Sequence, residues 1–154
     1  MKKRDERDFV DKYDMVNHIL VELFRDIMDI EEKAVITPEF KDITNNDMHI
    51  IEAIGRTQQK NMSSIAKSLS VTVGTLTIAI NNLVKKGYVS RVRSEKDRRV
   101  VLISLTDKGR NAFDHHKKFH ENMIDAVMRD IPDDEMEILL KALKNLTEFF
   151  HQYE

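Results

Sequence analysis

The sequence predicts an all-α fold with a small β-wing, and three observations support this fold class. Only two prolines and four glycines interrupt the 154 residues, which favours long helices with few breaks. Most of the chain places its apolar residues at steps of three and four, the spacing of one helix face. Between residues 88 and 105 this spacing changes to twofold alternation and a β-branched run, which indicates a β-hairpin.

The first two helices are delimited by residues that start or stop helical backbone. Residues 8–35 carry one apolar stripe and form a long helix, which ends before Pro38 because proline lacks a backbone N–H donor. Thr44 and Asp47 have the spacing of a capping box, so a second helix starts at Thr44. It ends at Gly55, where glycine permits a left-handed cap.

Two short helices follow, separated by a tight turn. Asn61 is a suitable cap for a helix over residues 62–69, and the turn at 70–72 leads into a helix that Gly87 closes. The buried stripe of this later helix is expected to consist of Leu76, Ile80 and Leu83. Two short helices around a tight turn are typical of a helix-turn-helix.

A β-hairpin and two helices complete the chain. Residues 88–93 and 100–105 form the two strands, and the short charged segment 94–99 joins them. Thr106 caps a long helix, and Pro132 separates that helix from the last one. A hairpin directly after a helix-turn-helix completes a winged helix-turn-helix.

The chain is expected to form a single domain over residues 1–154, because it shows no repeat and no long linker. The winged helix-turn-helix covers 44–105, and helices within 8–36 and 107–154 provide a dimerisation region from both ends of the chain. Their apolar stripes predict a homodimer. The residues expected at its interface are Ile19, Leu23, Ile27, Met136, Leu139, Leu143, Leu146 and Phe150.

Composition narrows the functional class. The absence of cysteine removes disulfides and thiolate metal sites, and neither a secretory signal nor a long apolar span is evident, so we expect a cytoplasmic protein with no membrane partner. Glycine-rich phosphate loops, Ser/His/Asp sets and paired carboxylates in an apolar setting are also absent from the sequence. We therefore expect neither an enzyme nor a cofactor.

Charge is unevenly distributed along the chain. Its net charge is −2, but the segment from Lys85 to Arg110 contains nine basic and three acidic residues, a net charge of +6. A basic block on an otherwise acidic chain is typical of a surface that binds phosphate groups. The alternative is a solvated basic face, and charge alone does not separate the two.

The helix that follows the tight turn is the candidate for reading DNA. Its exposed side is rich in small polar residues, and threonine is a middling helix former, which argues against selection for helix stability alone. Hydroxyl groups can contact bases or phosphates, and the methyl groups of threonine can contact thymine. The residues expected to contact DNA are Thr72, Gly74, Thr75, Thr77 and Asn81.

The hairpin is the second candidate for DNA contact. Arg98 and Arg99 at its tip are placed to enter a minor groove, whose negative potential attracts guanidinium groups. Asp97 is expected to orient one arginine through a bidentate pair, although a surface ion pair of little energetic value is the alternative. The remaining candidates in the hairpin are Arg91, Arg93 and Lys96.

These residues resemble a known family. The segment SSIAKSLSVTVGTLTIAINNLVKKGYVSRVRSEKDRRVVLISLTDKG (63–109) is similar to the DNA-binding region of MarR-family transcriptional regulators, most specifically in Asp-Arg-Arg (97–99) and Leu-Thr-Asp-Lys-Gly (105–109). The resemblance extends over the flanking helices. It implies a homodimer that binds a pseudo-palindromic operator in double-stranded DNA and answers to a ligand.

Two further segments resemble one branch of the family. Asp-Met-His-Ile-Ile-Glu-Ala-Ile-Gly (47–55) and Lys-Phe-His-Glu-Asn-Met (118–123) are similar to the fatty-acid-biosynthesis repressors of the FabT type. This resemblance implies a repressor of lipid-synthesis genes whose co-repressor is acyl-carrier protein bearing a long acyl chain.

Histidines and methionines suggest where an effector binds. His116 and His120 lie one helical turn apart, a spacing that can hold zinc, with His115 beside them and His49 able to approach from another helix. The preferred interpretation is a histidine beside an effector pocket, without a resident metal. The residues expected to line that pocket are Met28, His49, His116, His120 and Met123.

Overall fold

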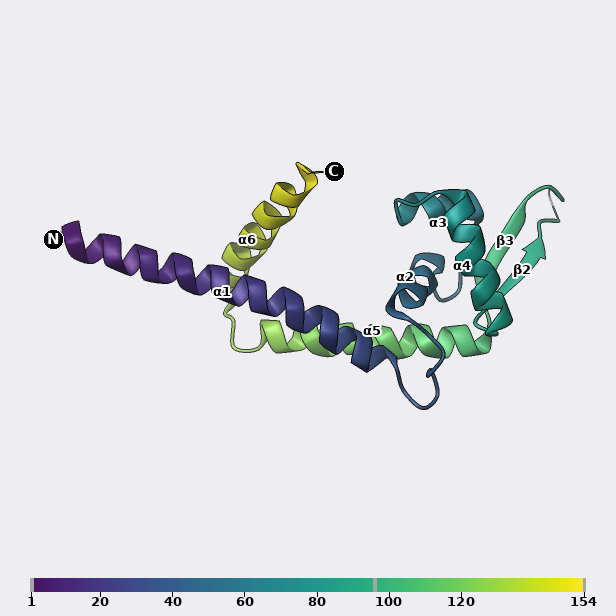
Figure 1. Cartoon of the computed structure of the whole chain (residues 1–154), viewed down its shortest axis with the longest axis horizontal. Helices are drawn as coiled ribbons and strands as arrows, with labels where there is room; N and C mark the ends of the chain where they lie inside the picture. The colour runs from purple at the N-terminus through teal and green to yellow at the C-terminus, as the bar shows by residue number, and fades with distance from the viewer. Residues whose placement is uncertain (1, 96, 154) are drawn as a thin grey trace. The chain divides into compact units, whose positions relative to one another are not determined.

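The computed structural model describes residues 2–95 and 97–153, with the side chains of 2–10, 32 and 35 left out, so the predicted DNA contact Lys96 lies outside the described residues. The elements are α1 (Lys2–Val35), α2 (Asn45–Ile54), β1 (Lys60–Asn61), α3 (Met62–Ser68), α4 (Val73–Lys85), β2 (Val89–Arg93), β3 (Val101–Leu105), α5 (Asp107–Met128) and α6 (Asp133–His151) (Figure 1). This order confirms the predicted class, a helical protein with a small β-wing. The first helix begins at Lys2, six residues earlier than predicted.

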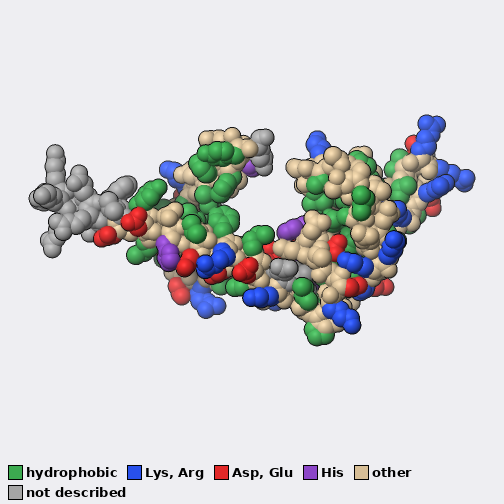
Figure 2. Space-filling view, in the orientation of Figure 1, with side chains coloured by type: hydrophobic (Ala, Val, Ile, Leu, Met, Phe, Trp, Pro, Cys, Tyr) green, Lys and Arg blue, Asp and Glu red, His purple; other side chains and the backbone are tan. Residues whose placement is uncertain are grey.

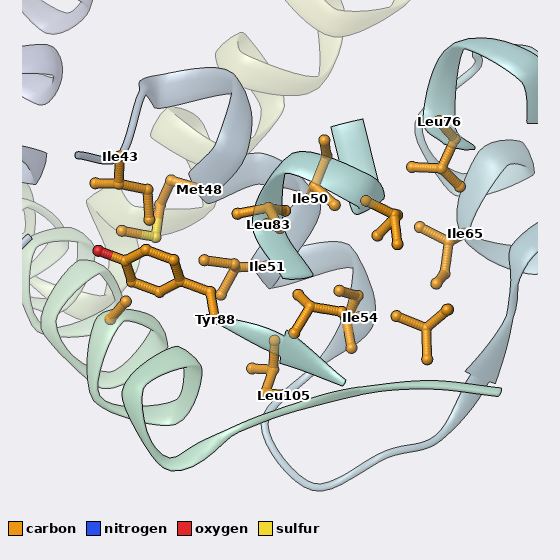
Figure 3. Close-up of a cluster of buried hydrophobic side chains, with 14 of the residues drawn as sticks. Ile43, Met48, Ile50, Ile51, Ile54, Ile65, Leu76, Leu83, Tyr88 and Leu105 are labelled. Carbon is orange, nitrogen blue, oxygen red and sulfur yellow. The ribbon is translucent and has the colours of Figure 1, made fainter. Parts of the chain in front are cut away.

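The chain divides into two compact units, one ending at His116 and the other starting at Lys117. The core of the first unit lies among α2, α3, α4, the sheet and the start of α5 (Figure 3). Full burial of one aliphatic side chain contributes about 1.5–3 kcal/mol, so this unit is stabilised by its own packing. Its largest fully buried side chains are Tyr88, Met48, Ile51, Ile54, Ile65, Leu76, Ile80, Leu83, Ile103 and His116.

The sheet has the strand order β1-β3-β2, and both pairings are antiparallel. In the hairpin, Val89 pairs with Leu105 and Arg93 with Val101. The sequence analysis missed β1, in which Lys60 pairs with Ile103. A two-residue polar strand is too short to show alternation, so only the partner strand reveals it.

Local capping chemistry positions the helices as the sequence predicts. The Thr44 side chain accepts a hydrogen bond from the Asp47 backbone N–H at 3.1 Å, and Asp47 accepts from the Thr44 N–H at 3.1 Å. Asn61 Oδ1 accepts from the Ser64 N–H at 2.8 Å at the start of α3. The predicted capping box and the predicted Asn61 cap are therefore confirmed.

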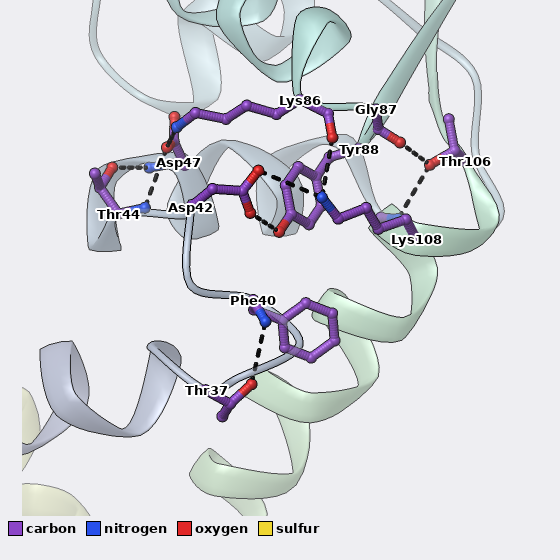
Figure 4. A network of polar contacts seen from close by, with 11 residues as sticks. Thr37, Phe40, Asp42, Thr44, Asp47, Lys86, Gly87, Tyr88, Thr106 and Lys108 are labelled. Carbon is purple, nitrogen blue, oxygen red and sulfur yellow. Dashed lines mark hydrogen bonds and ion pairs between the residues drawn. The ribbon is translucent and has the colours of Figure 1, made fainter.

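A polar network fixes the base of the hairpin against the neighbouring helices (Figure 4). The buried Tyr88 donates its hydroxyl to Asp42 Oδ1 at 2.7 Å, and Lys108 Nζ lies 4.0 Å from the centre of the tyrosine ring. Lys86 Nζ contacts Asp47 Oδ2 at 2.7 Å. Burial, reinforced by the hydrogen bond and charge of Asp42, raises the pKa of Tyr88, so its hydroxyl remains a donor.

Close packing between α5 and the base of the hairpin requires a glycine. A Cβ atom at Gly109 would lie 2.1 Å from the Tyr88 carbonyl oxygen, which is part of the backbone. No side chain fits at that distance without a backbone shift. Thr106 adds a hydrogen bond from its hydroxyl to the Gly87 carbonyl at 2.6 Å.

The outer helices differ from this packed region. In α6 every described residue is at least partly exposed, although apolar side chains recur along the helix. Many apolar side chains of α1 are also exposed, among them Ile19 and Leu23. Among the described residues, no single helix is long and apolar enough to cross a membrane; α3 and α4 meet that criterion only as a pair, bent by 106°.

Candidate nucleic-acid interface

The helix-turn-helix consists of α3, a four-residue turn and α4. The two helices are bent by 106°, within the range of roughly 90–120° that is typical of DNA-binding helix-turn-helix units. Ser70 has a φ of 54° in the turn, and the Val71 N–H donates to the Ala66 carbonyl at 3.0 Å. The backbone conformation of Ser70 and this hydrogen bond fix the orientation of the start of α4.

The start of α4 is capped by the side chain of Thr72. Thr72 Oγ1 accepts a hydrogen bond from the Thr75 N–H at 3.1 Å and lies 2.9 Å from the Thr75 hydroxyl. Both residues are exposed. The two hydroxyl groups therefore form one polar surface at the helix N-terminus, where the helix dipole favours a phosphate group.

Only some of the residues that were predicted to contact DNA lie on the outward face of α4. Gly74, Thr75 and Asn81 are exposed, whereas Thr77 is half-buried and its hydroxyl donates to the Val73 carbonyl at 2.7 Å. Thr77 is thus less available for DNA than predicted. The sequence analysis left out Ile78, which is 67% exposed.

Gly74 is not required by the packing of the chain. A Cβ atom there would meet only the Thr72 hydroxyl oxygen, at an ordinary contact distance of 3.7 Å. Glycine in a helix costs about 0.5–1 kcal/mol relative to alanine. Its presence on the outward face therefore favours close approach by another molecule.

The wing is a short hairpin with a well-defined turn. The Ser94 N–H donates to the Val100 carbonyl at 2.9 Å, and the Val100 N–H donates to the Asp97 carbonyl at 2.9 Å. Arg98 and Arg99 are exposed at the tip. The prediction for Asp97 was wrong: Asp97 Oδ1 accepts from the Arg99 backbone N–H at 2.9 Å and shapes the turn.

The basic residues of the region form two groups. Lys86 and Lys108 are paired with Asp47 and Asp42, and Arg110 is paired with Asp107. A second group, among the described residues, has no carboxylate partner within 4 Å and lies on α4 and the hairpin: Lys85, Arg91, Arg93, Arg98 and Arg99. Blue side chains gather over the hairpin in Figure 2. The first group stabilises the fold, and the second is available to phosphate groups.

The predicted dimerisation residues are partly exposed in the single chain. Ile19, Leu23 and Ile27 lie on α1, and Leu143 is 48% exposed on α6. The other predicted residues of α6 are Met136, Leu139, Leu146 and Phe150, all half-buried or exposed. Their role in a homodimer stays a prediction.

Of the predicted effector residues, the structure brings His49 and His116 together. Their ring centres lie 6.4 Å apart, whereas Met28 is exposed on α1. His120 and Met123 belong to the second compact unit. His49 also lines a cavity of about 240 Å³ between α2 and α4, whose other side includes Thr75.

His116 connects three helices through a buried charge cluster that the sequence did not predict. Its Nε2 lies 3.0 Å from Glu31 Oε1 on α1, and its Nδ1 lies 2.8 Å from Glu52 Oε1 on α2. Burial disfavours the charged ring, but the hydrogen bonds and charges of Glu52 and Glu31 outweigh it and raise the pKa of His116. The pKa of Glu31 is lowered, because hydrogen bonds from His116 and Asn45 outweigh the opposing effect of burial. Both directions favour an imidazolium between two carboxylates.

The sequence and the structure of the chain are similar to those of known transcriptional regulators. Residues 33–116 match the family model described as transcriptional regulator SarA/Rot. The regulator SarZ of Staphylococcus haemolyticus is 32% identical over 105 residues, covering 68% of this chain and 70% of SarZ. The structure of Streptococcus pneumoniae FabT in complex with DNA is 39% identical, with a TM-score of 0.81, and the match covers 92% of this chain and 99% of that one. The MarR-family regulator SP03579 has the same fold at 16% identity, with a TM-score of 0.74 and coverage of 96% and 95%.

The fold and these matches define a winged helix-turn-helix transcriptional regulator. The chain belongs to the SarA/Rot family of transcriptional regulators.

Proposed function

We propose that the chain is a repressor that binds a pseudo-palindromic DNA operator as a homodimer. In this arrangement α4 enters the major groove of each half-site and the wing reaches the adjacent minor groove. Its partner would be chromosomal DNA, and we therefore propose a cytoplasmic location.

One observation supports this proposal most strongly. The wing carries basic residues without acidic partners, and the neighbouring helix α4 has an outward face that does not pack against the rest of the chain. The exposed Arg98 and Arg99 have no acidic partner among the described residues, and Gly74 has no packing reason to be glycine. The similarity to FabT, which was solved with DNA, supports the same conclusion over nearly the whole chain.

We further propose control of fatty-acid-biosynthesis genes, with acyl-carrier protein bearing a long acyl chain as the co-repressor. The 39% identity to FabT supports this branch. An acidic carrier protein would dock near basic side chains such as Lys85 or Arg91, which are exposed and unpaired in the described structure. A long chain would contribute about 0.8 kcal/mol per buried methylene, so chain length would dominate affinity.

The test measures operator affinity in the presence of acyl-carrier protein with a long, a short or no acyl chain. Tighter binding with the long chain alone supports the proposal. Equal affinity with all three carriers would remove the fatty-acid assignment and leave the DNA-binding assignment intact.

Zinc is a second candidate effector, because the His116 cluster offers the donor types that this metal uses. On the Nδ1 side of the His116 ring, Glu52 Oε1 lies 2.8 Å from that nitrogen, and His49 Nδ1 lies 3.7 Å from Glu52 Oε2, so three donor groups from α2 and α5 approach one another there. A metal ion would replace the proton on His116. Zinc added to chelator-treated protein should then change operator affinity in the wild type and not in His116→Gln; no change in the wild type would exclude this candidate.

A further inference from the structure

Ile78 is the most exposed of the large apolar side chains of helix α4, ahead of Val73 and Val84. Ile78 is 67% exposed, whereas Leu76 and Ile80 beside it are 1% and 0% exposed. Figure 3 shows Leu76 and Leu83 among the side chains of the core. With about 100° of rotation per residue, Ile78 lies opposite this buried stripe, at the centre of the outward face.

The residues around Ile78 leave it accessible to a flat surface. Gly74, one turn earlier, has no side chain, and Asn81, nearly one turn later, is exposed and polar. The Thr75 hydroxyl is held close to Thr72 at 2.9 Å. Ile78 is therefore the most prominent apolar group on a face that is otherwise small and polar.

Helix stability does not explain this residue. Isoleucine is a poorer helix former than alanine, lysine or glutamate, because its branched side chain loses rotamer freedom. Isolated apolar side chains are common on protein surfaces. This one, however, occupies the position from which a recognition helix reaches the floor of the major groove.

Only one group on the floor of the major groove suits an aliphatic side chain. Guanine, adenine and cytosine present hydrogen-bond donors and acceptors there, whereas thymine adds a C5-methyl group. We propose that Ile78 is a specificity-determining residue that packs against the C5-methyl group of a thymine in each operator half-site. This inference rests on the proposed function, since it requires α4 to lie in the major groove.

The consequence is selection against cytosine as well as for thymine. Cytosine has hydrogen in place of the methyl group and an amino donor at the neighbouring carbon. An isoleucine over that position leaves the donor without an acceptor and removes it from water. Ile78 therefore selects by apolar contact, in contrast with the hydrogen-bonding groups of Thr75 and Asn81.

The experiment measures methyl dependence at each thymine. Duplexes that bind the full-length wild-type protein are selected from a random pool, and each thymine in the selected site is replaced in turn by deoxyuridine, which lacks only the methyl group. We expect one thymine per half-site whose replacement weakens binding about fourfold, and about 15-fold when both half-sites are changed. In Ile78→Ala the same replacements should change affinity less than twofold.

Val84→Ala is the matched control, because Val84 is an aliphatic residue of the same helix, 38% exposed and off the outward face. It should keep the full methyl dependence. Ile78→Ala should unfold at the wild-type temperature and bind random DNA with the wild-type salt dependence.

Two results would overturn the inference and leave the proposed function intact. One is a wild-type protein that selects a site without any methyl-sensitive thymine, and the other is Ile78→Ala with undiminished methyl dependence. A wild-type protein that selects no sequence at all would overturn both the inference and the proposed function.

Discussion

The winged helix and the outer helices use apolar residues in opposite ways. In α4 the apolar stripe is buried, the helix packs against α3 and β2, and three residues of the stripe are nearly or fully inaccessible. In α6 a comparable stripe contains no buried residue, and Leu143 and Phe150 each expose about half of their surface. In the first region, the chain itself buries the apolar stripe. The second leaves its stripe exposed, and under the proposed function a second copy of the chain covers it.

The largest effect is expected from a charge on the uncovered stripe. Leu143→Arg should leave the winged helix folded and weaken dimerisation by about 100-fold or more, because two arginines would be buried in one symmetric interface. Operator affinity should fall with it, since both half-sites are needed. Sedimentation velocity and operator binding measure the two effects. Lys141→Ala, on the opposite side of α6, is the control; an undiminished dimer in Leu143→Arg would show that α6 is not at the interface.

In the winged helix, the corresponding test is Gly109→Ala. The added Cβ would lie 2.1 Å from the Tyr88 carbonyl oxygen, so the base of the hairpin must move. We expect a loss of about 3 kcal/mol in the free energy of unfolding, measured with urea. Gly87→Ala is an informative comparison, because its Cβ meets no atom within 4 Å and any cost there comes from its φ of 80°. Unchanged stability in Gly109→Ala would contradict the packing described above.

The His116 cluster joins α1 to the winged helix, and its contribution should depend on pH. Because the pKa of His116 is raised, its stabilisation is fully present below the unfolded value of about 6.5 and is lost as pH rises through the folded value. The stabilisation by Glu31 depends on pH in the opposite direction, since it is lost as pH falls through the lowered pKa of this residue. Near pH 6 the free energy of unfolding of the wild type should therefore exceed that of His116→Gln by about 2 kcal/mol. This value is smaller than the loss expected for a fully buried ion pair, because Glu52 is partly exposed.

Urea unfolding of both proteins from pH 5 to pH 9 measures this difference. It should shrink as pH rises above about 6.5. A difference that stays constant over this range would mean that His116 is neutral in the folded protein.

Removal of the unpaired cations should affect DNA binding without affecting the fold. The double variant Arg98→Ala/Arg99→Ala should weaken binding to all duplexes and reduce the magnitude of the negative slope of log affinity against log salt by at most about two. Arg56→Ala is the control, because Arg56 is exposed and paired with Asp114 at 2.7 Å, away from the wing. A slope that matches the wild type would show that the wing does not contact phosphates.

The smallest effect has opposite signs for folding and binding. Gly74→Ala should stabilise the protein by about 0.5 kcal/mol, because alanine is the better helix former and its Cβ fits. DNA affinity should nevertheless decrease if the backbone approaches the duplex here. Thermal unfolding and operator binding give the two signs; an increase or no change in affinity would contradict the proposed approach.

The sequence was sufficient where a feature depends on neighbouring residues. Thr44 and Asp47 predict a capping box because both partners lie within one helical turn, and the buried stripe of α4 follows from the helical period. It was insufficient where the partner is distant. The strand β1 exists only because Lys60 meets Ile103, and the pKa of His116 is raised only because Glu31 and Glu52 reach it from other helices.

Side-chain roles within a turn were also not predictable. Asp97 had two partners within reach, an arginine side chain and a backbone amide, and the turn geometry decides for the amide. Thr77 likewise could face outward or bond to its own helix, and it bonds to Val73. Ile78 was not predicted as a DNA contact, although the helical period places it opposite the buried stripe.

The narrow space at Gly109 has a mechanical consequence. Since α5 touches the backbone of Tyr88 there, with no flexible side chain between them, the start of α5 cannot shift or rotate without displacing the residue that directly precedes β2. The Thr106 hydroxyl bond to Gly87 restrains the other end of the same junction. The first turns of α5 and the hairpin should therefore move as one rigid body, so that a small rotation at this junction becomes a larger displacement of Arg98 and Arg99 at the far end of the wing.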